Sequence, residues 1–299
     1  MKDEAIAPVV AFLLILTIVV SFFSIINAYY IPSLKQQSEV EHLQFVEEHF
    51  LELSPKIYQL LLVWQNASVK ESIQLGGGDV VFSPIKSSGF LQIDYNDTSL
   101  STISLDNFPE SSHIFPINIT YRPVGNYWIN QGYNWTNGIV FVTKAGKSTS
   151  LQSIIDNEND LSNENKRYYD LLLPKISYNI YGNNLTFLIF DIINIEKPVQ
   201  QSINGNGFGS IIIALNKTYE GNQNLTHEIE SNSMKININN NIKTEYLLNE
   251  RFNDVFREIN FKTNKSFWNK NTNTLTNENY YSENVSLQLR IWNLSFNVQ

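Results

Sequence analysis

The chain of 299 residues lacks several features that identify common classes of protein. It contains no cysteine, which excludes disulfide bonds, cysteine-based zinc sites and thiol nucleophiles. Its 21 Lys and Arg stand against 29 Asp and Glu, for a formal net charge of −8, and the basic residues form few clusters. Because phosphate binding needs concentrated positive charge, we expect no nucleic-acid partner.

Recognisable catalytic motifs are also missing. The sequence has no G-x-S-x-G elbow and no H-E-x-x-H pair. Its glycine-rich stretches, Leu75–Asp79 and Gly205–Ser210, are interpreted as turns, because a phosphate-binding loop leads into a helix whereas the second stretch leads into a strand-like run. We therefore predict no catalytic residue, no cofactor and no enzyme activity. An extracellular hydrolase would require the fold to bring paired carboxylates into a cleft.

Metal-binding patterns are equally weak. His42 and His49 lie one heptad apart on a predicted helix, and we interpret both as solvated helix histidines. The acidic stretch 156–165 begins like a calcium loop, but Leu161 and Arg167 stand where an EF-hand needs Gly and Glu. No metal ligand is predicted, and the alternatives are a metal site at His42 and His49 and a non-standard calcium site in 156–165.

One feature that is present is a long apolar run near the N-terminus. No residue from Ala5 to Leu34 is charged. As a helix, residues 5–31 would extend about 40 Å, whereas a bilayer core needs only about 20 residues. A cleavable secretory signal has an apolar stretch of roughly 7–15 residues followed by a small-residue cleavage site, which this run lacks. We therefore predict a retained membrane-spanning helix.

Small and weakly polar residues repeat along one face of this helix. Thr17, Ser21, Ser24 and Ala28 follow one another at intervals of four, three and four residues. Such a face lets helices approach closely without a water-driven force. Together with Pro8 they are the candidate helix–helix packing residues. The alternative is that the hydroxyls bond their own backbone and that the spacing is incidental.

The helix is predicted to continue over 33–65 as an amphipathic segment. Apolar residues recur every seven positions in two rows. The first row is Leu43, Phe50, Ile57 and Trp64, and the second is Val46, Leu53 and Leu60. This stripe predicts packing either on a neighbouring helix or on the downstream domain of the same chain, and we expect the latter for its C-terminal half.

Beyond residue 66, short alternating runs bounded by Gly, Asn, Asp and Pro predict β-strands. The clearest runs are 72–75, 89–95, 117–121, 138–143, 176–181, 185–195, 209–215, 234–238 and 285–296. Helices are expected around Tyr168 and over Thr244–Ile259. The predicted fold class is α+β, mainly β, with a long N-terminal helix and a β-sandwich-type extracellular domain over 66–299. The polar stretch 146–165 either divides that domain into two subdomains or forms one long loop.

Ten N-x-S/T sequons follow the apolar run, as expected for an outward-facing part of the chain. We predict glycosylation at some of them and single out none. The candidate asparagines are Asn66, Asn96, Asn118, Asn134, Asn184, Asn216, Asn224, Asn264, Asn284 and Asn293.

The segment DEAIAPVVAFLLILTIV, residues 3–19, resembles the N-terminal segment of archaeal type IV pilin-like proteins, in which charged residues precede a long apolar helix with an early proline. The resemblance implies a leader over 1–4 and a cut by a prepilin peptidase, with the helix 5–31 surviving as filament core. The implied processing region is Lys2, Asp3, Glu4 and Ala5.

Two hypotheses about function follow. In the first, the chain is a pilus subunit that is anchored in the membrane before assembly and then packs against copies of itself in a helical filament, with the pilus assembly machinery as a partner. Its outer domain would serve in adhesion or surface contact. In the second, the chain is a single-pass, non-polymerising cell-surface adhesin or ligand-binding protein.

Overall fold

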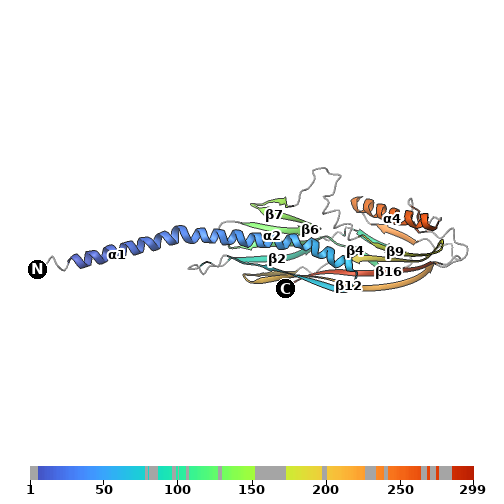
Figure 1. Ribbon diagram of the computed structural model, residues 1–299, viewed down its shortest axis with the longest axis horizontal. Coiled ribbons are helices and arrows are strands. Elements are labelled where there is room, and N and C mark those ends of the chain that lie inside the picture. The colour runs from blue at the N-terminus through green and yellow to red at the C-terminus, as the bar shows by residue number, and fades with distance from the viewer. Residues whose placement is uncertain are drawn as a thin grey trace.

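The computed structural model describes residues 6–77, 80, 87–95, 99, 101–105, 108–126, 130–151, 173–196, 201–225, 234–238, 242–263, 268–269, 274–275 and 285–299. A long helix projects from one end of an elongated, β-rich domain (Figure 1). The predicted processing residues, the helix expected around Tyr168 and the acidic stretch 156–165 lie outside the described residues. The α+β, mainly β class with a long N-terminal helix is confirmed.

The N-terminal helix runs without a break through three segments, α1 (Ile6–Ile25), the π-helical turn η1 (Ile26–Tyr30) and α2 (Ile31–Val63). In the turn, the backbone N–H of Ile31 donates to the carbonyl oxygen of Ile26, five residues earlier. Pro32 follows directly, and its ring would crowd the carbonyl four residues earlier in a regular α-helix. A wider π turn at this point relieves that clash, at the proline where the sequence predicts a kink in the helix.

Strands make up most of the described residues beyond α2 and form three sheets. The first sheet has the order β1 (Ala67–Gln74), β12 (Phe208–Leu225), β16 (Val285–Val298), β10 (Asn184–Asn194), β9 (Lys175–Tyr181). The second has the order β11 (Gln201–Gly205), β2 (Ser88–Tyr95), β5 (Ile117–Val124), β6 (Gln131–Thr136), β7 (Ile139–Lys144), β8 (Lys147–Ser150). The third has the order β14 (Trp268–Asn269), β15 (Thr274–Leu275), β13 (Met234–Ile238), β3 (Ser101–Leu105), β4 (Ser111–Ile114).

These strands include every run that the sequence predicted, and the helix expected over Thr244–Ile259 is observed as α4 (Ile242–Thr263). Neighbouring strands in the described sheets are antiparallel, apart from β10 and β16, which run parallel. The parallel pair brings residues about 100 positions apart side by side, for example Asp191 against Arg290.

The apolar stripe of α2 packs on the chain's own domain, as expected for its C-terminal half. Six of the seven residues of the stripe are buried in one core cluster, and Trp64 packs against its edge. The same cluster contains side chains from the first sheet, such as Ile213, and from the second, such as Trp135. Half of the long helix is therefore an integral part of the domain core.

The long strand β16 takes part in two cores, one on each of its faces, because side chains alternate along a strand. Odd-numbered residues of its first half join a second cluster, which contains Phe256 and Ile259 of α4. These residues are Val285, Leu287, Leu289 and Ile291. Even-numbered residues of its second half, Trp292, Leu294 and Phe296, join the cluster around α2. The subdomain boundary predicted over 146–165 falls largely on residues outside the described part and stays a prediction.

The described parts of the two glycine-rich stretches lie against each other. The backbone N–H of Leu75 donates to the carbonyl oxygen of Gly207 at 2.7 Å. A Cβ added to Gly76 would lie 2.2 Å from the carbonyl oxygen of Ser87, so no other residue fits there without a shift. Residues 206–207 form the bend between β11 and β12, which carries the chain from the second sheet to the first.

Candidate functional site

The most distinctive surface of the protein is the N-terminal half of its helix. The large apolar side chains from Val9 to Tyr30 in α1 and η1 are 43–76% exposed, apart from Ile26, which is partly buried. The most apolar 18-residue window has a mean hydropathy of 3.0 and none of it is buried. In Figure 1 this part of the helix extends away from the domain. A helix of this length and composition is able to cross a membrane.

Two hydroxyls of the small-residue face bond their own backbone. Thr17 Oγ1 donates to the carbonyl oxygen of Leu13, and Ser24 Oγ donates to that of Val20, each at 2.8 Å. These bonds satisfy both hydroxyls in an apolar medium without a second helix. The face of Thr17, Ser21, Ser24 and Ala28 is exposed and accessible to a partner, and Pro8, which lies on the opposite side of the helix, is exposed as well.

Polar and aromatic residues mark the end of the apolar segment. Tyr29 and Tyr30 are 76% and 60% exposed, and Asn27 Nδ2 donates to the carbonyl oxygen of Phe23. Tyrosine is favoured where a helix leaves the hydrocarbon layer, because its ring is apolar and its hydroxyl is hydrated. The π turn thus lies where a membrane-spanning segment would meet the aqueous phase.

His42 is buried on α2, contrary to the prediction of a solvated histidine. Its exposed fraction is 7%, and Nε2 lies 2.8 Å from the carbonyl oxygen of Gln74, to which it donates. Burial lowers the pKa of His42, and the contact with Gln74 and the charge of Glu39 oppose that shift without cancelling it. The prediction was wrong because α2 buries a face wider than its two heptad rows.

The lowered pKa of His42 predicts a loss of stability in mild acid. The unfolded chain takes up a proton below about pH 6.5, whereas the folded chain resists it, so stability is complete above that pH and falls as pH decreases. Between about pH 7.5 and about pH 5.5, the free energy of unfolding should fall more in the wild type than in His42→Gln, which keeps a donor for Gln74. Equal losses in the two proteins would contradict this assignment.

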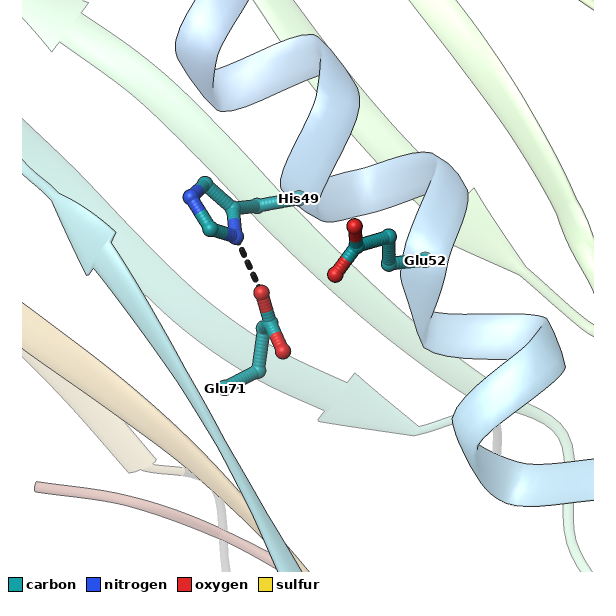
Figure 2. Close-up of side chains that lie close together, drawn as sticks. All are labelled: His49, Glu52 and Glu71. Carbon is teal, nitrogen blue, oxygen red and sulfur yellow. Dashed lines mark hydrogen bonds and ion pairs between the residues drawn. The ribbon is translucent and has the colours of Figure 1, made fainter. Parts of the chain in front are cut away.

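His49, Glu52 and Glu71 come together where α2 packs on β1 (Figure 2). His49 and Glu52 lie one turn apart on the helix, and Glu71, which is only 2% exposed, points at them from the strand. His49 Nδ1 contacts Glu71 Oε1 and its side chain is 24% exposed, so this histidine is only partly solvated, whereas a fully solvated one was predicted. One nitrogen or oxygen atom from each of the three residues lies within 4.8 Å of the other two.

Lys56 completes this cluster. Its Nζ lies 2.8 Å from Glu52 Oε2 and also forms an ion pair with Glu71. The hydrogen bond and charge of Lys56 lower the pKa of Glu52. Burial acts to lower the pKa of Lys56, but hydrogen bonds to Glu52 and Glu71 outweigh it and leave that pKa raised. Two carboxylates therefore converge on one cationic group at the junction of helix and domain.

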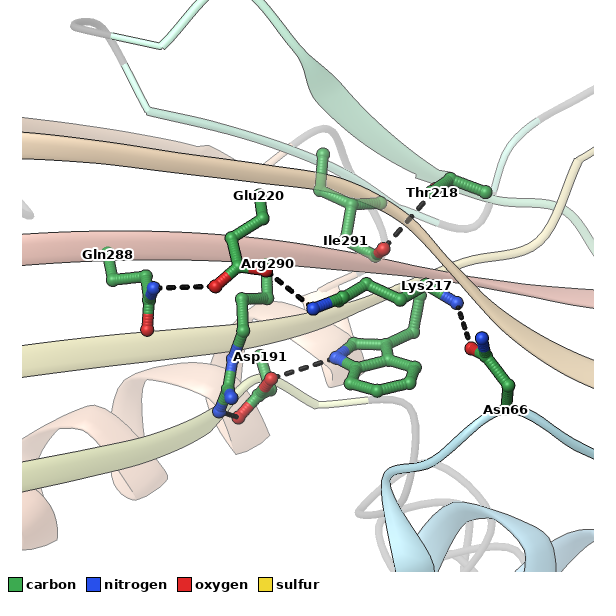
Figure 3. Close-up of polar contacts among 9 residues, drawn as sticks. Asn66, Asp191, Lys217, Thr218, Glu220, Gln288, Arg290 and Ile291 are labelled. Carbon is green, nitrogen blue, oxygen red and sulfur yellow. Dashed lines mark hydrogen bonds and ion pairs between the residues drawn. The ribbon is translucent and has the colours of Figure 1, made fainter.

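A second polar group lies on the first sheet (Figure 3). Asp191 Oδ2 accepts from Arg290 Nη2 at 2.5 Å, and Oδ1 accepts from the indole N–H of Trp292 at 2.8 Å. Asp191 is 1% exposed, whereas the Arg290 side chain is 26% exposed. Strand register places Lys175, Asp191, Arg290 and Glu220 in one row with alternating charge. We interpret this row as structural, because Asp191 is covered and its oxygens already have donors.

A cavity of about 560 Å³ lies over β5, β6 and β7. Its lining includes Arg122, Tyr133 and Asn134 but no Asp, Glu or His. The Tyr133 hydroxyl donates to Glu47 Oε2, and burial, with that bond, raises the pKa of Tyr133. Within the described part of the chain, this cavity does not supply the paired carboxylates that a hydrolase would need.

The sequon asparagines fall in different environments. Asn66 and Asn216 are exposed, although the side-chain oxygen of Asn66 accepts the backbone N–H of Lys217. The side-chain oxygens of Asn118 and Asn293 are buried. Asn134 and Asn184 are partly buried on β6 and β10, and Asn224 lies near the end of β12. Asn96, Asn264 and Asn284 lie outside the described residues.

Comparisons of the chain with protein-family models, with curated proteins and with solved structures find no match. The structure shows an exposed apolar helix that continues into the core of a β-rich domain.

Proposed function

We propose that the protein is a structural subunit of an extracellular filament of the archaeal type IV pilus kind. The observation that carries the proposal is the contrast between the two halves of the helix: α1 is apolar and exposed, whereas α2 is fixed in the domain core. Such a helix needs an apolar environment outside its own domain, and both a membrane and a bundle of identical helices provide one.

The proposed sequence of states follows from that need. Before assembly, α1 lies in the membrane and the domain faces outward. On assembly, α1 exchanges lipid for the helices of other subunits, with its small-residue face allowing close approach. The rigid junction of α2 with the sheets holds the domain at a fixed distance from the helix bundle, so domains would coat the filament. Only the sequence resemblance supports prepilin peptidase and the assembly machinery as partners.

The outer domain is proposed as a β-sandwich-type adhesion or contact module. Side chains of the first and second sheets meet α2 in one cluster, which supports a sandwich-like arrangement with the helix incorporated. Asn216 is an exposed sequon position on the first sheet, which supports glycosylation of the outer surface at some sites.

Electron microscopy of filaments sheared from cells that produce the protein tests the proposal directly. Mass spectrometry of the sheared fraction should detect the chain, with an N-terminus cut within residues 1–5. A chain that keeps Met1, is extracted only by detergent and is absent from every sheared filament would overturn the proposal.

A double substitution tests the small-residue face. Ser21→Leu with Ser24→Leu should leave membrane insertion intact, because leucine is more apolar, but should abolish or greatly shorten filaments, because two bulky side chains separate the helices. The matched control is Val19→Leu with Phe22→Leu, which lies on the opposite face at about 100° per residue and should assemble normally. Normal filaments from the serine variant would mean that this face is not an interface.

The second candidate is a single-pass, non-polymerising adhesin or ligand-binding protein. The backbone hydrogen bonds of Thr17 and Ser24 favour it, because they explain both hydroxyls in a lipid-exposed helix without a partner. Cross-linking in intact cells separates the candidates: cysteine pairs introduced along α1 should link subunits in the filament but stay unlinked in a monomeric anchor.

A further inference from the structure

We propose that His49, Glu52 and Glu71 form a binding site for a divalent transition-metal ion of the Zn²⁺ type, at the junction between α2 and β1. The site is independent of filament formation, because all three ligands belong to one chain and lie beyond the apolar segment.

The positions of the three residues follow from the local structure. His49 and Glu52 are three residues apart on α2, a spacing that places both side chains on the same face of a helix. Glu71 alternates with Val69 and Ile73 on the inward face of β1, so its carboxylate points at the helix instead of at water. Their three donor atoms lie within 4.8 Å of one another, a separation that small side-chain rotations would close around one ion.

The chemistry of the donors selects the class of metal. One imidazole nitrogen and two carboxylate oxygens match the His and Glu ligands of zinc sites, which leave a fourth position to water. Calcium takes six to eight oxygen ligands, and magnesium retains most of its waters, so neither suits this set. The fourth position is open to solvent, because Glu52 is 56% exposed and His49 is 24% exposed.

Lys56 is the internal competitor of the metal. Its ammonium group bridges Glu52 and Glu71, the same two carboxylates that a metal would need. This arrangement shows that the carboxylates converge on a position that accepts positive charge. Because the Lys56 side chain is 32% exposed on a flexible stem, it is able to leave for solvent when a divalent ion binds. Competition from Lys56 therefore limits the affinity of the site for the metal ion, and removal of the ammonium group would increase that affinity.

Metal binding would cross-link α2 to β1. Glu71 belongs to the strand that directly follows α2, so an ion joined to all three ligands would link the base of the projecting helix to the domain. An ion that binds the folded state alone raises the thermal midpoint in proportion to the logarithm of its concentration. A zinc-dependent rise in Tm is therefore the second expected readout.

The test is a zinc titration of the detergent-solubilised full chain, purified without a polyhistidine tag, in competition with a chromophoric chelator. The wild type should bind one Zn²⁺ per chain and show no comparable response to Ca²⁺ or Mg²⁺. Lys56→Gln should bind zinc at least roughly fivefold more tightly, since the ammonium group no longer competes for Glu52 and Glu71. Glu52→Gln should bind at least about tenfold more weakly, because a ligand is lost.

The control is Glu48→Gln, the same substitution at an exposed position of the same helix, which should match the wild type. The proposal is overturned if neither the wild type nor Lys56→Gln binds one equivalent of zinc at up to roughly 1 mM. Binding that is unchanged in both Glu52→Gln and His49→Gln would assign the zinc to another place and overturn it equally. If Lys56→Gln does not fold, zinc X-ray absorption of the wild type decides, with one imidazole in the coordination shell required.

Discussion

A chain that begins at Ile31 is expected to fold into a soluble domain about as stable as the full-length protein, whereas a chain that begins at Asn66 is expected not to fold. The part from α1 to Tyr30 contributes no side chain to either core cluster. By contrast, α2 contributes seven large apolar residues to the first cluster: Leu43, Val46, Phe50, Leu53, Ile57, Leu60 and Leu61. At about 1.5–3 kcal/mol each, their loss exceeds about 10 kcal/mol, which is comparable with the whole stability of a typical domain.

Circular dichroism and urea denaturation followed by tryptophan fluorescence provide the measurement. Single substitutions on α2 give the matched comparison. Phe50→Ala, at a side chain with no exposed area, should cost about 3–5 kcal/mol. Tyr58→Ala, at a side chain that is 41% exposed on the same helix, should cost much less. Cooperative unfolding of the chain from Asn66, with a midpoint like that of the full chain, would show that α2 is not part of the core.

Local pattern was enough to predict the helix and the position of many strands. The heptad rows of α2 identify its buried face because helix geometry is regular and local. Alternation in stretches such as 89–95 and 285–296 identifies strands for the same reason. The stripe alone does not decide its partner, because a neighbouring helix and a sheet bury the same side chains; the strand-rich sequence that follows favoured the chain's own domain for the C-terminal half.

The side-chain clusters were beyond prediction because they join distant segments. Glu71 reaches His49 only after β1 folds back along α2, and Asp191 reaches Arg290 only through the parallel pairing of β10 with β16. Signals did exist in the sequence. Glu71 alternates with Val69 and Ile73, which marks it as inward-facing, and Asp191 interrupts a run of nonpolar residues in β10. Charged residues in such positions are buried only with partners, but the sequence does not say which partners.

Removing the charge of Arg290 is expected to cause a large loss of stability near neutral pH. In Arg290→Met, the aliphatic part of the side chain is kept but the carboxylate of Asp191, 1% exposed, loses its counter-charge. An unpaired buried charge typically costs about 3–5 kcal/mol. The remaining hydrogen bond from the Trp292 indole does not compensate, because it satisfies one oxygen without neutralising the charge. Urea denaturation of the full chain in detergent measures the change.

A double-mutant cycle separates the loss of a charge partner from a loss of packing. Asp191→Asn keeps an oxygen for the Trp292 indole and removes the buried charge, so Arg290→Met combined with Asp191→Asn should be more stable than Arg290→Met alone. Lys217→Met serves as the surface control. Its ion pair with Glu220, 2.5 Å between Nζ and Oε2, lies on the same sheet, but both side chains are 39% exposed, so its removal should leave the midpoint almost unchanged (Figure 3). If the double variant were no more stable than Arg290→Met, the arginine would act through the packing of its aliphatic chain and not through its charge. The expected order of stability is therefore wild type, then the double variant, then Arg290→Met, since a buried carboxylate tolerates an apolar neighbour only after its own charge is gone.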